Sequence, residues 1–308
     1  MTKNSNVYFT GFIATFVGAI LFSTKAIMVK KAFADVHVPA VTLLALRMLF
    51  SLPFYIIAAF VSSNKSTNVK FTKKDWLLII FFGIIGYYLS SLFDFLGLQY
   101  VSAGIERLIL FLYPTFVVLI NALLFRQKVS VKQRIALLLT YAGIGIAYFG
   151  EIQEQQSDSN FMWGSILIFI CALTYATYLV GSGRLIPKLG PSKFTAYVML
   201  TATAGVLIHF AIVSDYHSLN ITPTLAKYGV MLAVIATVIP SFLIAFGMKK
   251  IGSNNTAIIT SIGPVSTILQ AHWILGEKMY TAQLIGTALV IAGVLLISWK
   301  EKTAAVAV

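Results

Sequence analysis

Ten long apolar runs follow one another along the 308 residues, and their length constrains the fold more than any other feature. Each approaches or exceeds the roughly 17 residues that cross the hydrocarbon core of a bilayer as a helix. In lipid, every backbone amide must be bonded within its own segment or within a closed barrel, and uninterrupted runs favour helices. The sequence therefore predicts an all-α membrane protein with ten transmembrane helices, near residues 8 to 29, 39 to 61, 75 to 96, 104 to 125, 133 to 149, 161 to 183, 193 to 213, 227 to 247, 254 to 275 and 280 to 298.

Composition excludes a water-soluble globule. The chain is 58% hydrophobic and 11% charged, whereas soluble domains carry about 25% charged residues. Its net charge of +13 would suggest nucleic acid if it formed one basic face, but the charge lies between the apolar runs. We therefore expect a lipid bilayer and no nucleic-acid partner. The first run lacks a small-residue cleavage site, so we expect it to be a permanent helix and not a signal peptide.

The basic residues predict the orientation, because lysine and arginine next to a membrane helix are retained in the cytoplasm. One set of alternate loops holds sixteen of them and the opposite set only four, Lys30, Lys31, Lys227 and Lys278. Both termini are therefore predicted to be cytoplasmic, as an even number of spans requires. The chain is expected to be a multi-pass protein of a bacterial inner membrane.

An internal repeat appears when the chain is shifted by 150 residues, so that positions 97 to 149 align with 247 to 299 without a gap. Pro114 then meets Pro264, and Lys128 meets Lys278. This predicts two five-helix repeats, residues 1 to 150 and 151 to 308. A unit with an odd number of spans places its second copy upside down, which is the inverted arrangement of many secondary transporters.

Two prolines are candidate hinges. Pro114 and Pro264 fall inside the fourth and ninth predicted spans, where a proline removes a backbone hydrogen bond and allows a bend. Either they serve the exchange between inward-open and outward-open states or they are static kinks.

The sequence also resembles a known family. Each half opens with a glycine followed by small and aromatic residues, and the second half closes with Gly263-Pro264, Gly276-Glu277 and Gly293. These features resemble the paired EamA domains of the drug/metabolite transporter superfamily, and the resemblance covers nearly the whole chain. In the first half Arg126-Gln127 replaces the usual glycine-glutamate pair. The resemblance implies transport of a small-molecule substrate such as an amino acid, a sugar phosphate or a nucleotide sugar, and it implies export.

Five ionisable residues lie inside the predicted spans: Lys25, Arg47, Asp94, Glu106 and Arg107. A charge at the centre of a membrane helix costs at least about 2.5 to 3.5 kcal/mol on insertion scales, so each needs a partner, water or a function. The predicted topology places all five in the outer half of the first repeat. They form either an ionic substrate site or a structural network of salt bridges, and Lys25 could also snorkel to the interface.

Within this set Arg47 is the best candidate for an anion contact, because a guanidinium can hold a carboxylate through two hydrogen bonds. Asp94 shares a helical face with Tyr87 and Ser91, so this stripe is expected to line a cavity. Burial disfavours an ionised aspartate, which would suit coupling to protons. An ion pair with Lys25 or Arg107 would instead keep Asp94 ionised.

Several hydroxyl groups complete the candidate substrate site. Tyr113, Tyr175 and Tyr178 could form amphipathic walls of a solute pathway, although such tyrosines often pack or lie at the interface. Thr260 shares one face of the ninth span with Thr267, but threonines commonly bond to their own helix.

Enzyme chemistry and bound cofactors are not expected. The sequence has no G-x-x-x-x-G-K-[ST] loop and no H-E-x-x-H motif, and its four histidines lack metal-ligand spacing. The sequence thus predicts a secondary transporter that exports small polar or zwitterionic metabolites such as amino acids, with protons as the candidate coupling ion. The alternatives are an exchanger of anionic metabolites and, from another class, an integral membrane enzyme or scaffold.

Overall fold

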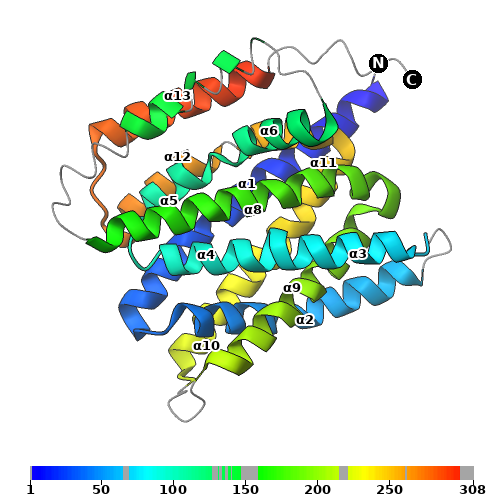
Figure 1. Ribbon diagram of the computed structural model, residues 1–308, viewed down its shortest axis with the longest axis horizontal. Coiled ribbons are helices and arrows are strands. Elements are labelled where there is room, and N and C mark those ends of the chain that lie inside the picture. The colour runs from blue at the N-terminus through cyan, green and yellow to red at the C-terminus, as the bar shows by residue number, and fades with distance from the viewer. Residues whose placement is uncertain are drawn as a thin grey trace.

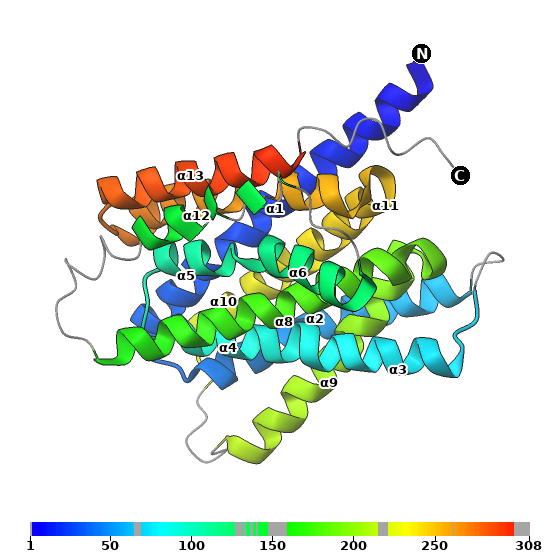
Figure 2. The ribbon, with the colours of Figure 1, turned by 45° about the horizontal axis from the view of Figure 1, so that its top comes forward.

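The computed structural model describes residues 2–64, 69–126, 131, 134–135, 138–139, 141–146, 159–214, 221–260 and 262–298. Within these ranges all regular structure is helical, and the helices form one bundle (Figures 1 and 2). The elements are α1 (Thr2–Val36), α2 (Ala40–Ser63), α3 (Lys73–Phe81), η1 (Phe82–Leu89), α4 (Ser90–Gly97), α5 (Ala103–Leu110), α6 (Tyr113–Phe125), α8 (Ser159–Leu189), α9 (Pro191–Val213), α10 (Pro223–Ala233), η2 (Val234–Val238), α11 (Ile239–Ile259), α12 (Ile262–Gln270), η3 (Ala271–Leu275) and α13 (Thr281–Ser298).

Polar residues next to the apolar runs set several helix ends. Thr72 and Ser102 accept hydrogen bonds from the backbone N–H groups of Asp75 and Ile105, and the Asp75 carboxylate in turn accepts from the Thr72 N–H. These side chains bond donors that a helix leaves free at its first turn. At the other end of a helix, Gly276 has φ 70°, a left-handed conformation that glycine adopts without a steric penalty.

Seven described segments are long and apolar enough to cross a membrane: Tyr8–Val36, Ala40–Ser63, Lys73–Gly97, Ala103–Leu124, Asn160–Leu189, Pro191–Val213 and Pro223–Ile251. They match seven of the ten predicted runs, and Thr281–Gly293 is a shorter apolar helix in the tenth. The fifth run, 133 to 149, is described only in pieces, at residues 134–135, 138–139 and 141–146, and the ninth includes residue 261, which is outside the described residues. The prediction of a helical membrane protein is confirmed, and the count of ten spans stays a prediction.

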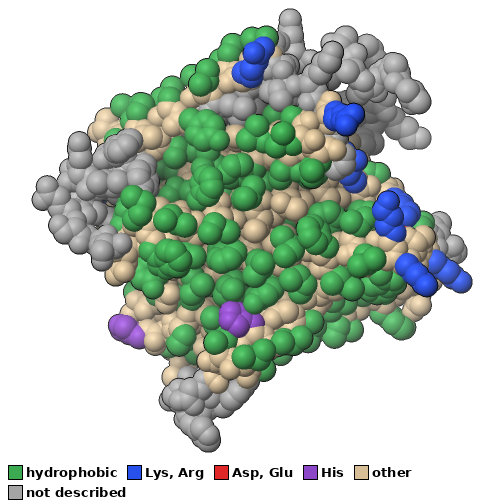
Figure 3. Space-filling model, in the orientation of Figure 1, with side chains coloured by type: hydrophobic (Ala, Val, Ile, Leu, Met, Phe, Trp, Pro, Cys, Tyr) green, Lys and Arg blue, Asp and Glu red, His purple; other side chains and the backbone are tan. Residues whose placement is uncertain are grey.

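Apolar side chains cover the outside of the bundle as well as its core. Phe60, Leu123, Ile212 and Trp273 are all well exposed. Figure 3 shows this apolar surface across the middle of one face, with lysine and arginine side chains at the end where α3 begins. A helix that is apolar on both its packed and its exposed faces fits lipid better than water.

Two helix pairings between the halves of the chain show the same contact. A Cβ atom added to Gly11 in α1 would meet Gly247, Lys250 and Ile251, and one added to Gly164 in α8 would meet Gly97, Tyr100 and Val101. Positions 97, 100 and 101 correspond to positions 247, 250 and 251 when the chain is shifted by 150 residues. The close packing of α1 with α11 is therefore repeated by α8 with α4.

The two candidate hinge prolines begin helices instead of interrupting them. The fourth predicted span is divided at Phe111 and Leu112 into α5 and α6, and Pro114 lies in the first turn of α6. Pro264 similarly lies near the start of α12. The sequence led us to expect each proline at mid-helix, and each lies instead near the start of a helical segment; the role of either proline as a hinge stays a prediction. There the missing N–H would have had no intrahelical partner in any case.

Candidate functional site

Three neighbouring cavities lie inside the bundle and share the side chains of Phe22 and Tyr175. We name them after one lining residue each. Counting the open space that adjoins each cavity, the Arg47 cavity measures about 320 Å³, the Arg107 cavity about 370 Å³ and the Tyr178 cavity about 410 Å³. The rings of Phe22 and Tyr175 are stacked, with their centroids 6.2 Å apart and an interplanar angle of 15°. This pair of rings stands where the three cavities meet.

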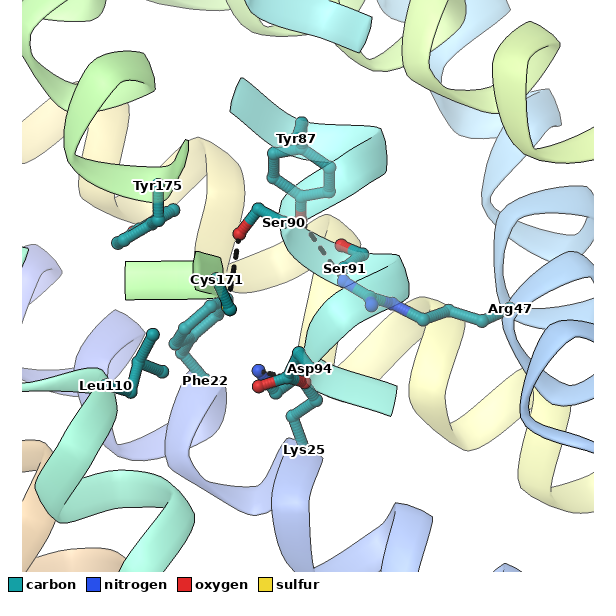
Figure 4. A pocket seen from close by; sticks show the side chains of 10 residues that line it. All are labelled: Phe22, Lys25, Arg47, Tyr87, Ser90, Ser91, Asp94, Leu110, Cys171 and Tyr175. Atoms are coloured by element: carbon teal, nitrogen blue, oxygen red, sulfur yellow. Dashed lines mark hydrogen bonds and ion pairs between the residues drawn. The ribbon is translucent and has the colours of Figure 1, made fainter. Parts of the chain in front are cut away.

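The Arg47 cavity gathers most of the predicted polar stripe. Its lining residues are Phe22, Lys25, Arg47, Tyr87, Ser90, Ser91, Asp94, Leu110, Cys171 and Tyr175. In Figure 4, Arg47 enters from the side opposite Phe22, Leu110 and Tyr175, and its guanidinium points towards Tyr87. The structure therefore places Tyr87, Ser91 and Asp94 on one cavity, as their spacing in the sequence predicts.

Arg47 is 1% exposed and is held by hydroxyls and aromatic rings. Its Nε donates a hydrogen bond to Thr237 Oγ1 at 2.6 Å, and its Nη2 donates one to Tyr87 Oη at 3.2 Å. The guanidinium carbon lies 5.3 Å from the centre of the Phe95 ring. Among the described residues, no carboxylate forms a salt bridge with Arg47, and its Nη1 has no hydrogen-bond partner. Arg47 thus retains an unused donor and an uncompensated charge beside the cavity.

The other four buried charges form a separate network, which we call the quartet: Lys25, Asp94, Glu106 and Arg107. Lys25 Nζ lies 2.7 Å from Asp94 Oδ2 and 3.6 Å from Glu106 Oε1, and Arg107 Nε lies 3.7 Å from Glu106 Oε2. All four side chains are at most 5% exposed. With every member ionised the quartet carries no net charge. It has the form of the predicted salt-bridge network, and Asp94 in particular adopts the ion-pair alternative.

The Arg107 cavity holds the other predicted hydroxyls. Tyr113, Thr260 and Pro264 line it together with Arg107 and Ser23, and Tyr113 Oη lies 2.9 Å from Thr260 Oγ1. Tyr178 lies instead on the third cavity, beside Ser182 and Met248. Glu106 lines none of the three cavities and is fully buried behind Lys25 and Arg107. The predicted site residues thus converge on one region of the bundle, but they divide among separate cavities.

Sequence reasoning missed the contact of Arg47 with Thr237 and the backbone form that presents it. Tyr87 and Thr237 lie in the π-helical segments η1 and η2, and their positions differ by the 150 residues of the internal repeat. π-helical turns inside longer helices are rare and frequently occur at functional sites. Extending the repeat alignment towards the N-terminus would have paired these two residues. Thr267 was noticed only as a face-sharing neighbour of Thr260, whereas it accepts a hydrogen bond from Arg107 Nε at 3.1 Å.

Comparison with known proteins agrees with this architecture. The model of the EamA-like transporter family matches residues 9–149 and again 162–299. The uncharacterized transporter YcbK of Bacillus subtilis is 33% identical over 282 residues, which cover 90% of this chain and 88% of YcbK. The uncharacterized inner membrane transporter YicL of Salmonella typhimurium is 22% identical over 293 residues, or 94% of this chain and 95% of YicL.

A solved crystal structure with a similar fold is among the matches. It has a TM-score of 0.69 at 19% sequence identity, and the match covers 94% of this chain and 96% of that one. The family model matches most of the chain in two copies, one in each half. The resemblance to EamA domains is thereby confirmed, and the chain belongs to the EamA-like transporter family.

Proposed function

We propose that this chain is a secondary transporter that exports a small polar or zwitterionic metabolite, such as an amino acid, by alternating access. The observation that carries the proposal is the state of Arg47. A buried guanidinium without a carboxylate partner in the described chain, with Nη1 unused and a cavity beside it, is suited to hold the carboxylate of a substrate. Burying such a charge is costly, and a bound anion would offset that cost.

The same cavity offers a place for a substrate ammonium group. Asp94 lines it and is 1% exposed. Its partner Lys25 is an ammonium on a flexible stem and could be displaced by another ammonium. A zwitterion could therefore bind between Arg47 and Asp94, with Tyr87 and Ser91 as further hydrogen-bonding groups.

Alternating access follows from the proposed architecture of two inverted five-helix repeats, residues 1–150 and 151–308. The repeated glycine contact of α1 with α11 and of α8 with α4 supports it, as does the division of α5 and α12 from their neighbours next to Pro114 and Pro264. We place the chain in a bacterial inner membrane with both termini in the cytoplasm. The direction of transport is inferred from the family resemblance.

A second candidate is an exchanger of anionic metabolites. Lys25, Arg47 and Arg107 give the buried site three cations against the two anions Asp94 and Glu106. This excess of one positive charge favours a substrate whose net charge is negative.

Counterflow in proteoliposomes tests the proposal. Vesicles loaded with one unlabelled solute are diluted into the same solute in labelled form, using a panel of amino acids, organic acids and sugar phosphates. We expect transient accumulation of at least one solute by the native protein and its loss in Arg47→Ala. Arg126→Ala, at an exposed position at the end of α6, is the matched control and should retain accumulation. Absence of counterflow for every solute, in folded and correctly inserted protein, would contradict the proposal.

A further inference from the structure

We propose that the Arg107 cavity is a second binding site for an anionic group such as a carboxylate, separate from the Arg47 cavity. The inference rests on the proposed transport function and extends it from one substrate-binding site to two. Three observations support it: a hydrogen-bond donor of Arg107 without a partner, hydroxyl groups on the same cavity, and an aromatic ring that separates this cavity from the Arg47 cavity.

The donor is Arg107 Nη2. The Arg107 side chain is 5% exposed, and its Nε is already committed to Thr267 Oγ1 at 3.1 Å. Nη2 is buried and has no hydrogen-bond partner in the part of the chain that the structure describes. A buried N–H group without a partner lowers the stability of the folded protein. A ligand oxygen in this cavity could accept a hydrogen bond from Arg107 Nη2.

The hydroxyls lie on the same cavity. Tyr113 Oη and Thr260 Oγ1 contact each other across the two halves of the chain at 2.9 Å, whereas Ser23 Oγ directs its single proton at the carbonyl oxygens of Ala19 and Gly263, at 2.8 and 3.3 Å. The contact between Tyr113 and Thr260 uses one of their two hydroxyl protons, and a hydroxyl next to a guanidinium can donate to a carboxylate. The chemistry resembles that of the Arg47 cavity, where Tyr87 and Ser91 accompany Arg47.

The partition is the ring of Phe22. Lys25 Nζ, on the Arg47 cavity, lies 5.1 Å from its centre, and the guanidinium carbon of Arg107 lies 5.7 Å from it. Phe22 also stacks on Tyr175, and both rings line both cavities. An anion bound at Arg107 is therefore separated from Arg47 by aromatic side chains, and passage from one site to the other requires these rings to move.

The two sites should differ in affinity. Arg47 has no acidic partner among the described residues, whereas Arg107 forms an ion pair with Glu106 in the quartet. An anion at Arg107 must be held in the presence of that carboxylate. We expect the Arg47 site to bind more tightly.

Binding of acetate tests this inference without knowledge of the natural substrate. Equilibrium dialysis of purified protein against labelled acetate, with chloride keeping the ionic strength constant, should show two sites per chain. Arg107→Lys and Tyr113→Phe should weaken the weaker site at least severalfold and leave the tighter one unchanged. Tyr87→Phe is the matched control, because it removes the corresponding hydroxyl from the Arg47 cavity and should weaken the tighter site alone.

The outcomes separate this inference from the proposed function. One acetate site per native chain, or two sites that are both insensitive to Arg107→Lys, Tyr113→Phe and Thr260→Val, would overturn the inference. If Arg107→Lys fails to fold, Tyr113→Phe and Thr260→Val still decide, because neither removes a buried charge. Two acetate sites in a protein that shows no counterflow would leave the inference standing and contradict transport. Counterflow with only one acetate site would do the reverse.

Discussion

Replacement of Arg47 separates a substrate contact from a structural role. In Arg47→Lys the charge remains, but the planar guanidinium is lost. That group bonds Thr237 and Tyr87 and has Nη1 left over for a ligand. A hydrogen bond to a charged group contributes about 1.5 to 3 kcal/mol, and about 1.4 kcal/mol corresponds to a factor of ten. Loss of one such bond to the substrate should therefore weaken binding by roughly tenfold to a hundredfold.

Arg47→Ala tests the same reasoning from the side of stability. The salt bridges of the described residues do not include Arg47, so its removal leaves no carboxylate uncompensated. We expect the melting temperature of the ligand-free protein to change little. A bound ligand stabilises the native state by RT ln(1 + [L]/Kd), so the ligand-induced rise in melting temperature should disappear.

The assay is thermal unfolding of purified protein with and without a solute that shows counterflow. Native protein, Arg47→Lys and Arg47→Ala are measured over a range of solute concentrations. A large drop in the melting temperature of ligand-free Arg47→Ala, together with an intact ligand-induced shift, would refute the binding role of Arg47.

Three further outcomes are expected. Lys25→Ala should lower the melting temperature strongly, because removing one partner of a buried ion pair costs about 3 to 5 kcal/mol; an unchanged melting temperature would show that the quartet adds no stability. With Cys171 buried, a membrane-impermeant thiol reagent in intact cells should label His37→Cys and not Lys70→Cys, and the reverse pattern would invert the orientation. Gly164→Ala places a methyl group 2.6 Å from Tyr100 Cβ and should destabilise by about 1 to 3 kcal/mol in thermal unfolding. Gly145→Ala, with nothing within 4 Å, is its control, and equal effects of the two changes would contradict the packing argument.

The sequence predicts the membrane spans well because the lipid imposes one requirement on every residue of a span. A run such as Ala40–Ser63 carries a single charged residue, Arg47, so it is visible in composition alone. The convergence of Lys25, Asp94, Glu106 and Arg107 could also be predicted, because topology places them at one depth and charges at that depth need partners.

The division of the site could not be predicted in this way. Helices that are apolar on all sides carry no periodic signal for their register, so the π-helical turns at Tyr87 and Thr237 leave no trace in hydropathy. The sequence shows that a proline can interrupt a helix, but not on which side of the proline the helix ends. The starts of α6 and α12 just before Pro114 and Pro264 could therefore not be predicted from composition. Whether Arg47 joins the quartet or stands apart depends on side-chain contacts across helices, such as the one with Thr237.

The quartet also has a consequence for biosynthesis, because its members leave the ribosome at different times. Lys25 is in the first helix and is synthesised well before Asp94 and Glu106, which reach the membrane only with α4 and α5. At about 5 to 20 residues per second, Lys25 spends a period on the order of seconds without its carboxylates. During this interval α1 should lie near the insertion machinery or the headgroups, where a lone ammonium is tolerated, and it should settle to its final depth when α4 and α5 arrive. The four charges thus let α1 reach its final position only after α4 and α5 have been made, although it is the first helix to be synthesised.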